Sequence, residues 1–173
     1  RFMRRSGYPL SRYGLSFKHL GWSLVEAVVF TLPMLVLFTG MKWLVLWGQN
    51  LSGTMPLVAF PDVVARFQEP RVQFLFSVYA LTCLVQEFIV RGALQSGLKM
   101  FLTGPKAKWG SILVAALLFS MTHLHMSFLF ASLAFLPGVF WGWLFERRPN
   151  LAGVTLSHCL VGGYVFFVLG VKL

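Results

Sequence analysis

Residues 86–92 have the sequence QEFIVRG and place a glutamate and an arginine four residues apart inside an apolar run. The run covers residues 71–102 and ends at Thr-Gly-Pro, a sequence that stops helices. It is long enough to span a membrane, because about 20 helical residues cross a hydrocarbon core of about 30 Å. Glu87 and Arg91 share one helical face because their spacing is i,i+4. The stretch therefore predicts a membrane helix with a buried charge pair.

The composition is that of a membrane protein. Of the 173 residues, 57% are hydrophobic and only 12% are charged, and the mean hydropathy is +0.74. Soluble globular domains are far less apolar. Several runs are long enough to span a bilayer, and none alternates with the two-residue period of a β-barrel strand. The sequence thus predicts an all-α, polytopic transmembrane helix bundle.

We expect about five spans, at residues 21–47, 71–102, 109–125, 126–145 and 151–171. Pro33 lies in the middle of the first span, where it is expected to kink or break the helix. The connection at 48–70 holds two short apolar clusters around Pro61, which favours a loop with an interfacial helix. The chain then divides into a basic juxtamembrane segment (1–20), a first span with its loop (21–70) and a helical core (71–173).

Positive charge gathers in alternate connections. Lys and Arg dominate residues 1–20, 99–108 and 146–149, whereas 48–70 and the turn at 125–127 carry no excess of them. This alternation is what the positive-inside rule requires of five spans with a cytoplasmic N-terminus. The basic residues form no stripe with interleaved aromatics, so the net charge of +10 predicts contact with anionic lipid headgroups and no binding of nucleic acid. The sequence begins at Arg1 without a methionine, as expected of a fragment of a longer chain.

Ionisable side chains inside the spans are the candidates for chemistry, since each costs a few kcal/mol to bury. Besides Glu87, they include His123 in the third span and His158 in the fifth. Counted at about 1.5 Å per residue from the basic ends, with tilt ignored, the three lie about 22, 21 and 12 Å deep. They can therefore meet inside the membrane. An acid and an imidazole that share a water can take its proton and direct the hydroxide to a carbonyl, as in peptide hydrolysis.

Simpler interpretations stay open. Glu87 with Arg91 can be a structural ion pair that fixes the rotation of its helix. An acid with two histidines is also a donor set for zinc. No dense ligand motif such as H-E-x-x-H is present, so the sequence favours a site without metal or another cofactor. The remaining features have structural readings: helix packing for the G-x-x-x-G at 138–142, small packing side chains without a disulfide for Cys83 and Cys159, an interfacial position for His125, and no assigned role for Glu26.

Three motifs on successive spans resemble those of the CPBP family, also called CAAX-protease or Abi, of intramembrane endopeptidases. The family motifs Glu-Glu-x-x-x-Arg, Phe-x-x-x-His and His-x-x-x-Asn/Asp match residues 86–91, 119–123 and 158–162 in this order. Phe119 opens the second motif. The resemblance covers residues 71–171 and implies a CPBP-type core with catalytic residues on three helices.

Two positions depart from the family pattern. Gln86 stands where the family has its first glutamate, and Gly162 stands where it has Asn or Asp. In the family the glutamates and a histidine are thought to activate water, and the Asn is thought to help hold the developing oxyanion. An amide cannot accept a proton as a carboxylate does, although it can orient a water or donate to an oxyanion.

The resemblance implies roles for the matched residues. Glu87 is expected to be the general base, tuned by Arg91, with His123 positioning the water. His158 is expected to contact the carbonyl oxygen or orient the water, and Gln86 to be a polar group behind the reacting atoms.

The function predicted from these residues is hydrolysis of a peptide or membrane-protein substrate within the bilayer. Losing one oxyanion donor typically costs about 10²–10³ in rate. The alternative is therefore a catalytically degenerate homologue that acts as a membrane scaffold, as a subunit that binds a helical membrane partner, or as a regulatory anchor. A small transporter is disfavoured because no inverted repeat is visible.

Overall fold

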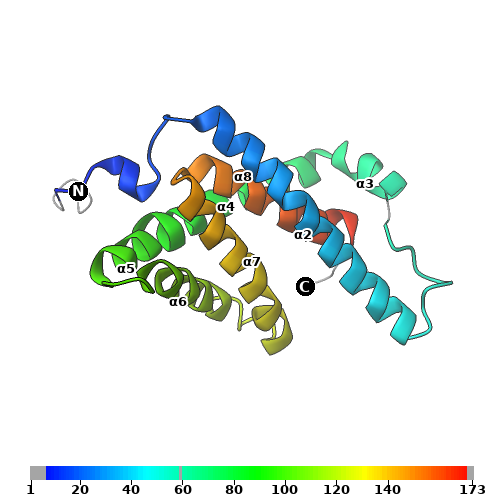
Figure 1. The fold of residues 1–173 in the computed structure, drawn as a ribbon. Coiled ribbons are helices and arrows are strands. Elements are labelled where there is room, and N and C mark those ends of the chain that lie inside the picture. Colours follow the sequence, from blue (N-terminus) through cyan, green and yellow to red (C-terminus); the bar gives the residue numbers. More distant parts are fainter. Residues whose placement is uncertain (1–6, 59, 171–173) are drawn as a thin grey trace.

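The computed structural model describes residues 7–58 and 60–170, and all regular structure in these ranges is helical (Figure 1). The elements are, in chain order, η1 (Leu10–Tyr13), α2 (Leu20–Gly48), α3 (Phe60–Phe67), α4 (Pro70–Glu87), η2 (Phe88–Gln95), α5 (Ser96–Phe101), α6 (Ala107–Met121), α7 (Phe128–Arg147), α8 (Leu151–Gly163) and η3 (Tyr164–Val168). The segment η1 is a 3₁₀ turn, whereas η2 and η3 are π-helical. The predicted all-α fold is confirmed.

Four helical segments of the described chain are long and apolar enough to cross a membrane. They are Leu20–Gly48, Pro70–Phe101, Phe128–Arg147 and Leu151–Val168. Large apolar side chains remain exposed along them, including Val36 at 71% and Phe74 at 67% exposure. Lipid tails cover such surfaces in an integral membrane protein.

The third expected span, 109–125, is shorter than predicted. Helix α6 ends at Met121, because the following residues form tight turns in which the amides of His123 and Met126 donate to Ser120 and His123 at 3.0 Å. Its 15 residues extend only about 22 Å, less than a hydrocarbon core of about 30 Å. The described chain thus has four full-length candidate spans and one short apolar helix where about five spans were expected.

The first span and its connection also differ in detail from expectation. Pro33 does not break α2, which is continuous from Leu20 to Gly48. A short helix, α3, does lie in the connection at 48–70. Its position at the membrane surface remains a prediction.

Helix α8 lies at the centre of the bundle. It packs against α2, α4 and α7, while α6 and α7 form a hairpin beside it (Figure 1). Glycines allow the closest approaches. A Cβ at Gly153 of α8 would lie 2.8 Å from the carbonyl oxygen of Ser23 in α2, and one at Gly138 of α7 would lie 3.2 Å from Cβ of Ala116 in α6. The G-x-x-x-G at 138–142 was expected to pack against another helix, and it packs against α6.

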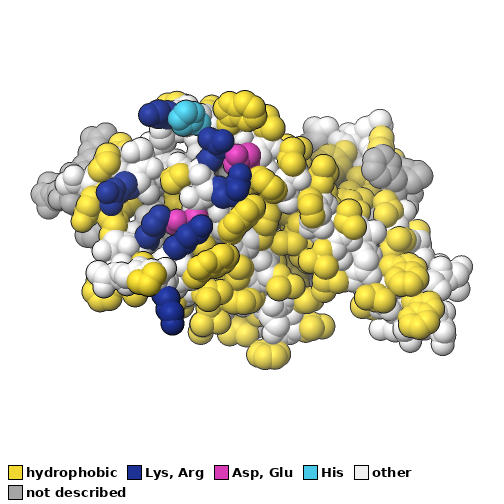
Figure 2. All heavy atoms as spheres, viewed as in Figure 1, with side chains coloured by type: hydrophobic (Ala, Val, Ile, Leu, Met, Phe, Trp, Pro, Cys, Tyr) yellow, Lys and Arg dark blue, Asp and Glu magenta, His cyan; other side chains and the backbone are white. Residues whose placement is uncertain are grey.

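The basic connections meet at one end of the bundle. The amide of Leu151 donates to the carbonyl of Gly14 at 3.0 Å, and the hydroxyl of Ser96 donates to the carbonyl of Arg12 at 3.0 Å. Glu26, which had no assigned role, lies 2.8 Å from Nε of Arg148. Figure 2 shows Lys and Arg side chains gathered on this end of the visible face, and hydrophobic side chains over much of the rest.

Candidate functional site

Glu87 is the last residue of α4 and has no exposed surface. Its Oε1 lies 2.7 Å from Nδ1 of His158, which α8 supplies. An ionised carboxylate can only accept a hydrogen bond, so the imidazole donates from Nδ1. The two side chains therefore lie at the same level of the bundle. The straight-helix count, which ignored tilt, had placed them about 10 Å apart in depth.

Arg91 neutralises the other side of the carboxylate. Its Nε lies 3.2 Å from Oε2 of Glu87, and its Nη2 donates to the carbonyl of Gly138 at 2.8 Å. The guanidinium is fully buried and lies over the ring of Phe119, 5.1 Å from the centroid. A buried acid is strongly disfavoured unless it is paired, and both partners of Glu87 come from residues that the sequence had singled out.

Arg91 lies on a π-helical segment that sequence analysis did not anticipate. The run from Pro70 to Phe101 changes from α to π geometry at Phe88 and returns to α at Ser96. π segments are rare and frequently occur at functional sites. The sequence did hold one sign of an unusual segment here. Two polar residues that follow the motif, Gln95 and Ser96, are buried as Arg91 is and continue its polar face.

The ring of His158 is held on its faces and edges by aromatic residues. It stacks on Trp141 with centroids 4.0 Å apart and meets Phe119 edge-on at 5.7 Å. The indole N–H of Trp141 donates to the hydroxyl of Ser157 at 3.1 Å, and that hydroxyl lies 2.6 Å from the hydroxyl of Thr31. This chain of contacts ties α7, α8 and α2 together around one imidazole.

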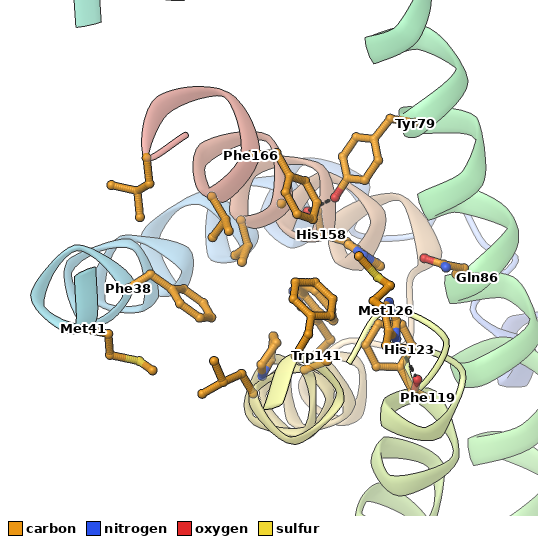
Figure 3. A pocket seen from close by; sticks show the side chains of 18 of the residues that line it. Phe38, Met41, Tyr79, Gln86, Phe119, His123, Met126, Trp141, His158 and Phe166 are labelled. Carbon is orange, nitrogen blue, oxygen red and sulfur yellow. Dashed lines mark hydrogen bonds between the residues drawn. The ribbon is translucent and has the colours of Figure 1, made fainter. Parts of the chain in front are cut away.

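A cavity of about 540 Å³ opens beside this imidazole (Figure 3). Most of its wall is apolar and comes from α2, α6, α7 and α8. The polar groups on the wall include Tyr79, Gln86, His123 and His158. Because Glu87 occupies Nδ1 of His158, Nε2 is the ring nitrogen that remains for the cavity.

Gln86 and Glu87 lie in each other's expected places. Glu87 was expected to face the water and Gln86 to lie behind it, whereas Gln86 is the residue on the cavity wall. Gln86 lines the cavity, and Figure 3 shows it extending from α4 toward His158. Glu87 does not line the cavity. Neighbouring helical residues point about 100° apart, so only one of the two faces the cavity, and here it is Gln86, which the sequence had been expected to place behind the reacting atoms.

His123 reaches the same cavity from the turn after α6. Its Nδ1 lies 3.0 Å from the carbonyl oxygen of Phe119, and its ring lies 4.8 Å from the Phe119 ring. Phe119 thus separates the two imidazoles, with His123 against one part of its ring and His158 against another. His125, expected at the interface, also lines the cavity and is exposed.

Tyr79 is a polar cavity residue that sequence analysis missed. It belongs to α4, seven residues or about two helical turns before Gln86, and therefore lies on the same face of that helix as Gln86. Its ring stands 6.4 Å from the ring of His158. The motif position Gly162 lies directly against it, as described below.

Residues 7–58 and 60–170 contain no group of three or more His, Cys, Asp or Glu side chains arranged to hold a metal ion. Cys83 and Cys159 are both free thiols. The site consists of one buried acid with two partners and a cavity whose polar lining is mostly neutral. Such a site can orient an imidazole toward a bound water.

Comparison with known proteins matches the chain to a protein family. The family model described as "Type II CAAX prenyl endopeptidase Rce1-like" matches residues 68–163, more than half of the 173-residue chain. The matched range contains all three motifs. No curated protein and no solved structure matched the chain.

Proposed function

Because the chain belongs to the Rce1-like family of type II CAAX prenyl endopeptidases, we propose that it hydrolyses a peptide bond inside the membrane with His158 as the general base. The observation that supports this proposal is the 2.7 Å contact between Glu87 and His158. The role proposed for Glu87 differs from the one expected from the sequence. The carboxylate acts on water through the imidazole, since Glu87 has no surface in the cavity.

The carboxylate has two effects on the imidazole. By accepting from Nδ1, Glu87 fixes the tautomer that leaves a lone pair on Nε2. It also stabilises the imidazolium that forms when Nε2 takes a proton, as the acid does in a Ser-His-Asp triad. Arg91 holds the carboxylate in place through an ion pair on its other oxygen.

The reaction follows from these positions. A water in the cavity gives a proton to Nε2 of His158 while its oxygen attacks the carbonyl carbon of the substrate. The carbonyl oxygen becomes an oxyanion. The imidazolium then returns the proton to the amide nitrogen as the C–N bond breaks, which leaves a carboxylic acid and an amine. The amide N–H₂ of Gln86 and the ring of His123 line the cavity and are available to the oxyanion or the water.

The substrate class proposed is an apolar peptide presented from the membrane. The wall of the cavity includes Phe38, Leu133 and Val165, which suit an apolar chain. The family description names prenyl endopeptidases. A farnesylated CAAX peptide is accordingly the first substrate to test, with the same peptide lacking its prenyl group as the comparison.

A second candidate function is the catalytically degenerate homologue. The observation that favours it is Gln86, which presents an amide to the cavity at the position where the family motif has a carboxylate. Such a chain would bind a peptide or a membrane helix without cleaving it.

The test is cleavage of a quenched-fluorescent farnesylated CAAX peptide by the protein in liposomes. We expect the wild type to cleave and Glu87→Gln to reduce kcat by about 10²–10⁴, the contribution of general-base catalysis. The matched control is Glu26→Gln, the same change in a carboxylate paired with Arg148 at the basic end. A folded Glu87→Gln variant with wild-type kcat would contradict the proposed role. Cleavage by Gln86→Glu but not by the wild type would establish the degenerate function instead.

A further inference from the structure

The space beside Gly162 is filled by the hydroxyl of Tyr79. A Cβ placed on Gly162 would lie 1.7 Å from Oη and 2.8 Å from Cζ of Tyr79, both far below contact distance. No residue with a side chain fits at 162 while Tyr79 keeps its position. The glycine of the third motif therefore marks a place occupied from another helix.

The tyrosine hydroxyl lies at the cavity wall next to the imidazole. Tyr79 extends from α4 toward α8, and both Tyr79 and His158 line the cavity (Figure 3). The phenol is held by ring contacts with Phe76 at 6.3 Å and Phe166 at 6.1 Å. A rigid aromatic ring thus sets the position of a single polar atom.

The hydroxyl has two weak partners in the described chain, the thiol of Cys83 one turn along α4 and the backbone carbonyl of His158. It donates to the backbone carbonyl of His158 at 3.5 Å, the outer limit of a hydrogen bond. A phenol O–H that can rotate about its C–O bond can exchange such a weak acceptor for a charged one. Hydrogen bonds to an oxyanion are shorter and roughly twice as strong as bonds between neutral groups.

We propose that the Tyr79 hydroxyl is a catalytic hydrogen-bond donor to the carbonyl oxygen of the scissile bond, in place of any side chain at position 162. This inference rests on the proposed function for its chemistry. When water adds to the carbonyl carbon, the negative charge on the oxygen draws the phenol proton into a hydrogen bond. The proton stays on Tyr79, and no bond of the tyrosine breaks. The phenol then acts on the carbonyl oxygen while His158 acts on the attacking water, and the two side chains occupy neighbouring positions on the wall.

The first measurement is the kcat and KM of Tyr79→Phe on the farnesylated CAAX peptide. Removing one oxyanion donor typically lowers kcat by about 10²–10³, and we expect this loss with a rise in KM of no more than about tenfold. The matched control is Tyr164→Phe. It removes the same atom from a tyrosine whose hydroxyl instead lies 2.6 Å from that of Thr39. Equal kcat for Tyr79→Phe and the wild type would overturn the inference and leave the proposed function standing.

The second measurement moves the donor from α4 to α8. Tyr79→Leu vacates the space at 162, and the double variant Tyr79→Leu/Gly162→Asn places an amide donor there. We expect kcat of Tyr79→Leu to fall as far as that of Tyr79→Phe. The double variant should have a kcat at least tenfold higher than that of Tyr79→Leu. Gly162→Asn alone should be inactive, because the amide and the phenol compete for one space. A double variant no more active than Tyr79→Leu would contradict the inference.

A third measurement separates this inference from the proposed function. The probe is the same peptide with a ketomethylene group in place of the scissile amide, which keeps the carbonyl oxygen but cannot be cleaved. We expect Tyr79→Phe to bind it roughly three- to tenfold more weakly than Tyr164→Phe, the effect of one hydrogen bond. If neither the wild type nor Gln86→Glu cleaves peptide but this difference is found, the proposed function fails and the donor role of Tyr79 holds. Equal affinities overturn the donor role.

Discussion

Arg91 and Glu87 form an ion pair with no exposed surface on either side chain. Moving two charges out of water costs several kcal/mol each, and their attraction offsets this cost only when further hydrogen bonds are made. Here the carbonyl of Gly138 and the imidazole of His158 supply these bonds. Neither partner can therefore be removed alone without leaving a buried charge uncompensated.

Removing one partner of this pair should be far worse than removing both. We expect Arg91→Met to lower the free energy of unfolding by about 3–5 kcal/mol, because it leaves the Glu87 carboxylate buried without its cation. The double variant Arg91→Met/Glu87→Gln should regain most of that loss. The measurement is denaturant unfolding in detergent micelles.

The control for this prediction is Arg147→Met. Arg147 lies 3.5 Å from Glu26, but its side chain is 41% exposed, and such pairs contribute about 0–1 kcal/mol. Equal losses for the two single variants would contradict the importance assigned to the buried pair.

At this scale the sequence identified most of the site. The i,i+4 spacing predicted the Glu87–Arg91 pair, and the motifs predicted His158. The orientation of two adjacent residues could not be predicted, because the exchange of Gln86 and Glu87 depends on the rotation of α4 against α8. Tyr79 was missed for the same reason, since nothing in its own helix marks it as the neighbour of Gly162.

The helices are held together where glycines remove side chains from the contact. At Gly153 the helix approaches the backbone of α2, because a Cβ there would meet Oγ of Ser23 at 2.1 Å and the backbone oxygen of the same residue at 2.8 Å. The hydroxyl can rotate away, whereas the backbone oxygen cannot move without moving α2. The contact between α2 and α8 thus depends on position 153 having no side chain.

Gly153→Ala should destabilise the protein by about 1–3 kcal/mol, the usual cost of overpacking. Gly40→Ala is the matched control, since Gly40 lies within the same pair of packed helices but a Cβ there meets nothing within 4 Å. It should be neutral or slightly stabilising, because alanine is the better helix former. The two variants can be compared by thermal unfolding in the same detergent. Equal melting temperatures would argue against a tight α2–α8 contact.

The helices were predictable at this scale because apolar runs of about 20 residues and their flanking charges define spans directly. The π segment at Phe88–Gln95 was not predictable. Its wider turn depends on tertiary contacts of Arg91 and Gln95 with the backbone of α7, at Gly138 and Gly142. The early end of α6 likewise depends on turn hydrogen bonds after Met121 that leave no trace in hydropathy.

In the whole molecule, the basic connections lie together at one end, as the alternation of charge along the sequence predicted. This end is held by contacts among the first residues, the α5 segment and the α7–α8 turn, including an ion pair between Lys99 and Glu146. The positive-inside rule predicts that this end faces the cytoplasm.

Cysteine labelling tests that orientation. In a background with Cys83 and Cys159 changed to Ala, we expect an impermeant maleimide to label Gly53→Cys in right-side-out vesicles. Lys106→Cys should be labelled only after the vesicles are opened. Both positions are exposed. A cysteine that is not labelled therefore lies on the inaccessible side of the membrane and is not simply buried. The reverse pattern would invert the topology.

The brevity of α6 has a consequence for the bilayer itself. A rod of about 22 Å in an oily layer of about 30 Å leaves roughly 8 Å unmatched. Hydrophobic mismatch of this kind is relieved when the neighbouring leaflet thins or the rod tilts. The turn after Met121, which carries His123 and His125, is where the thinning would fall. A local dimple in the lipid would bring bulk solvent down to the imidazole side of the protein, and an otherwise dry interior would gain its supply of reactant water.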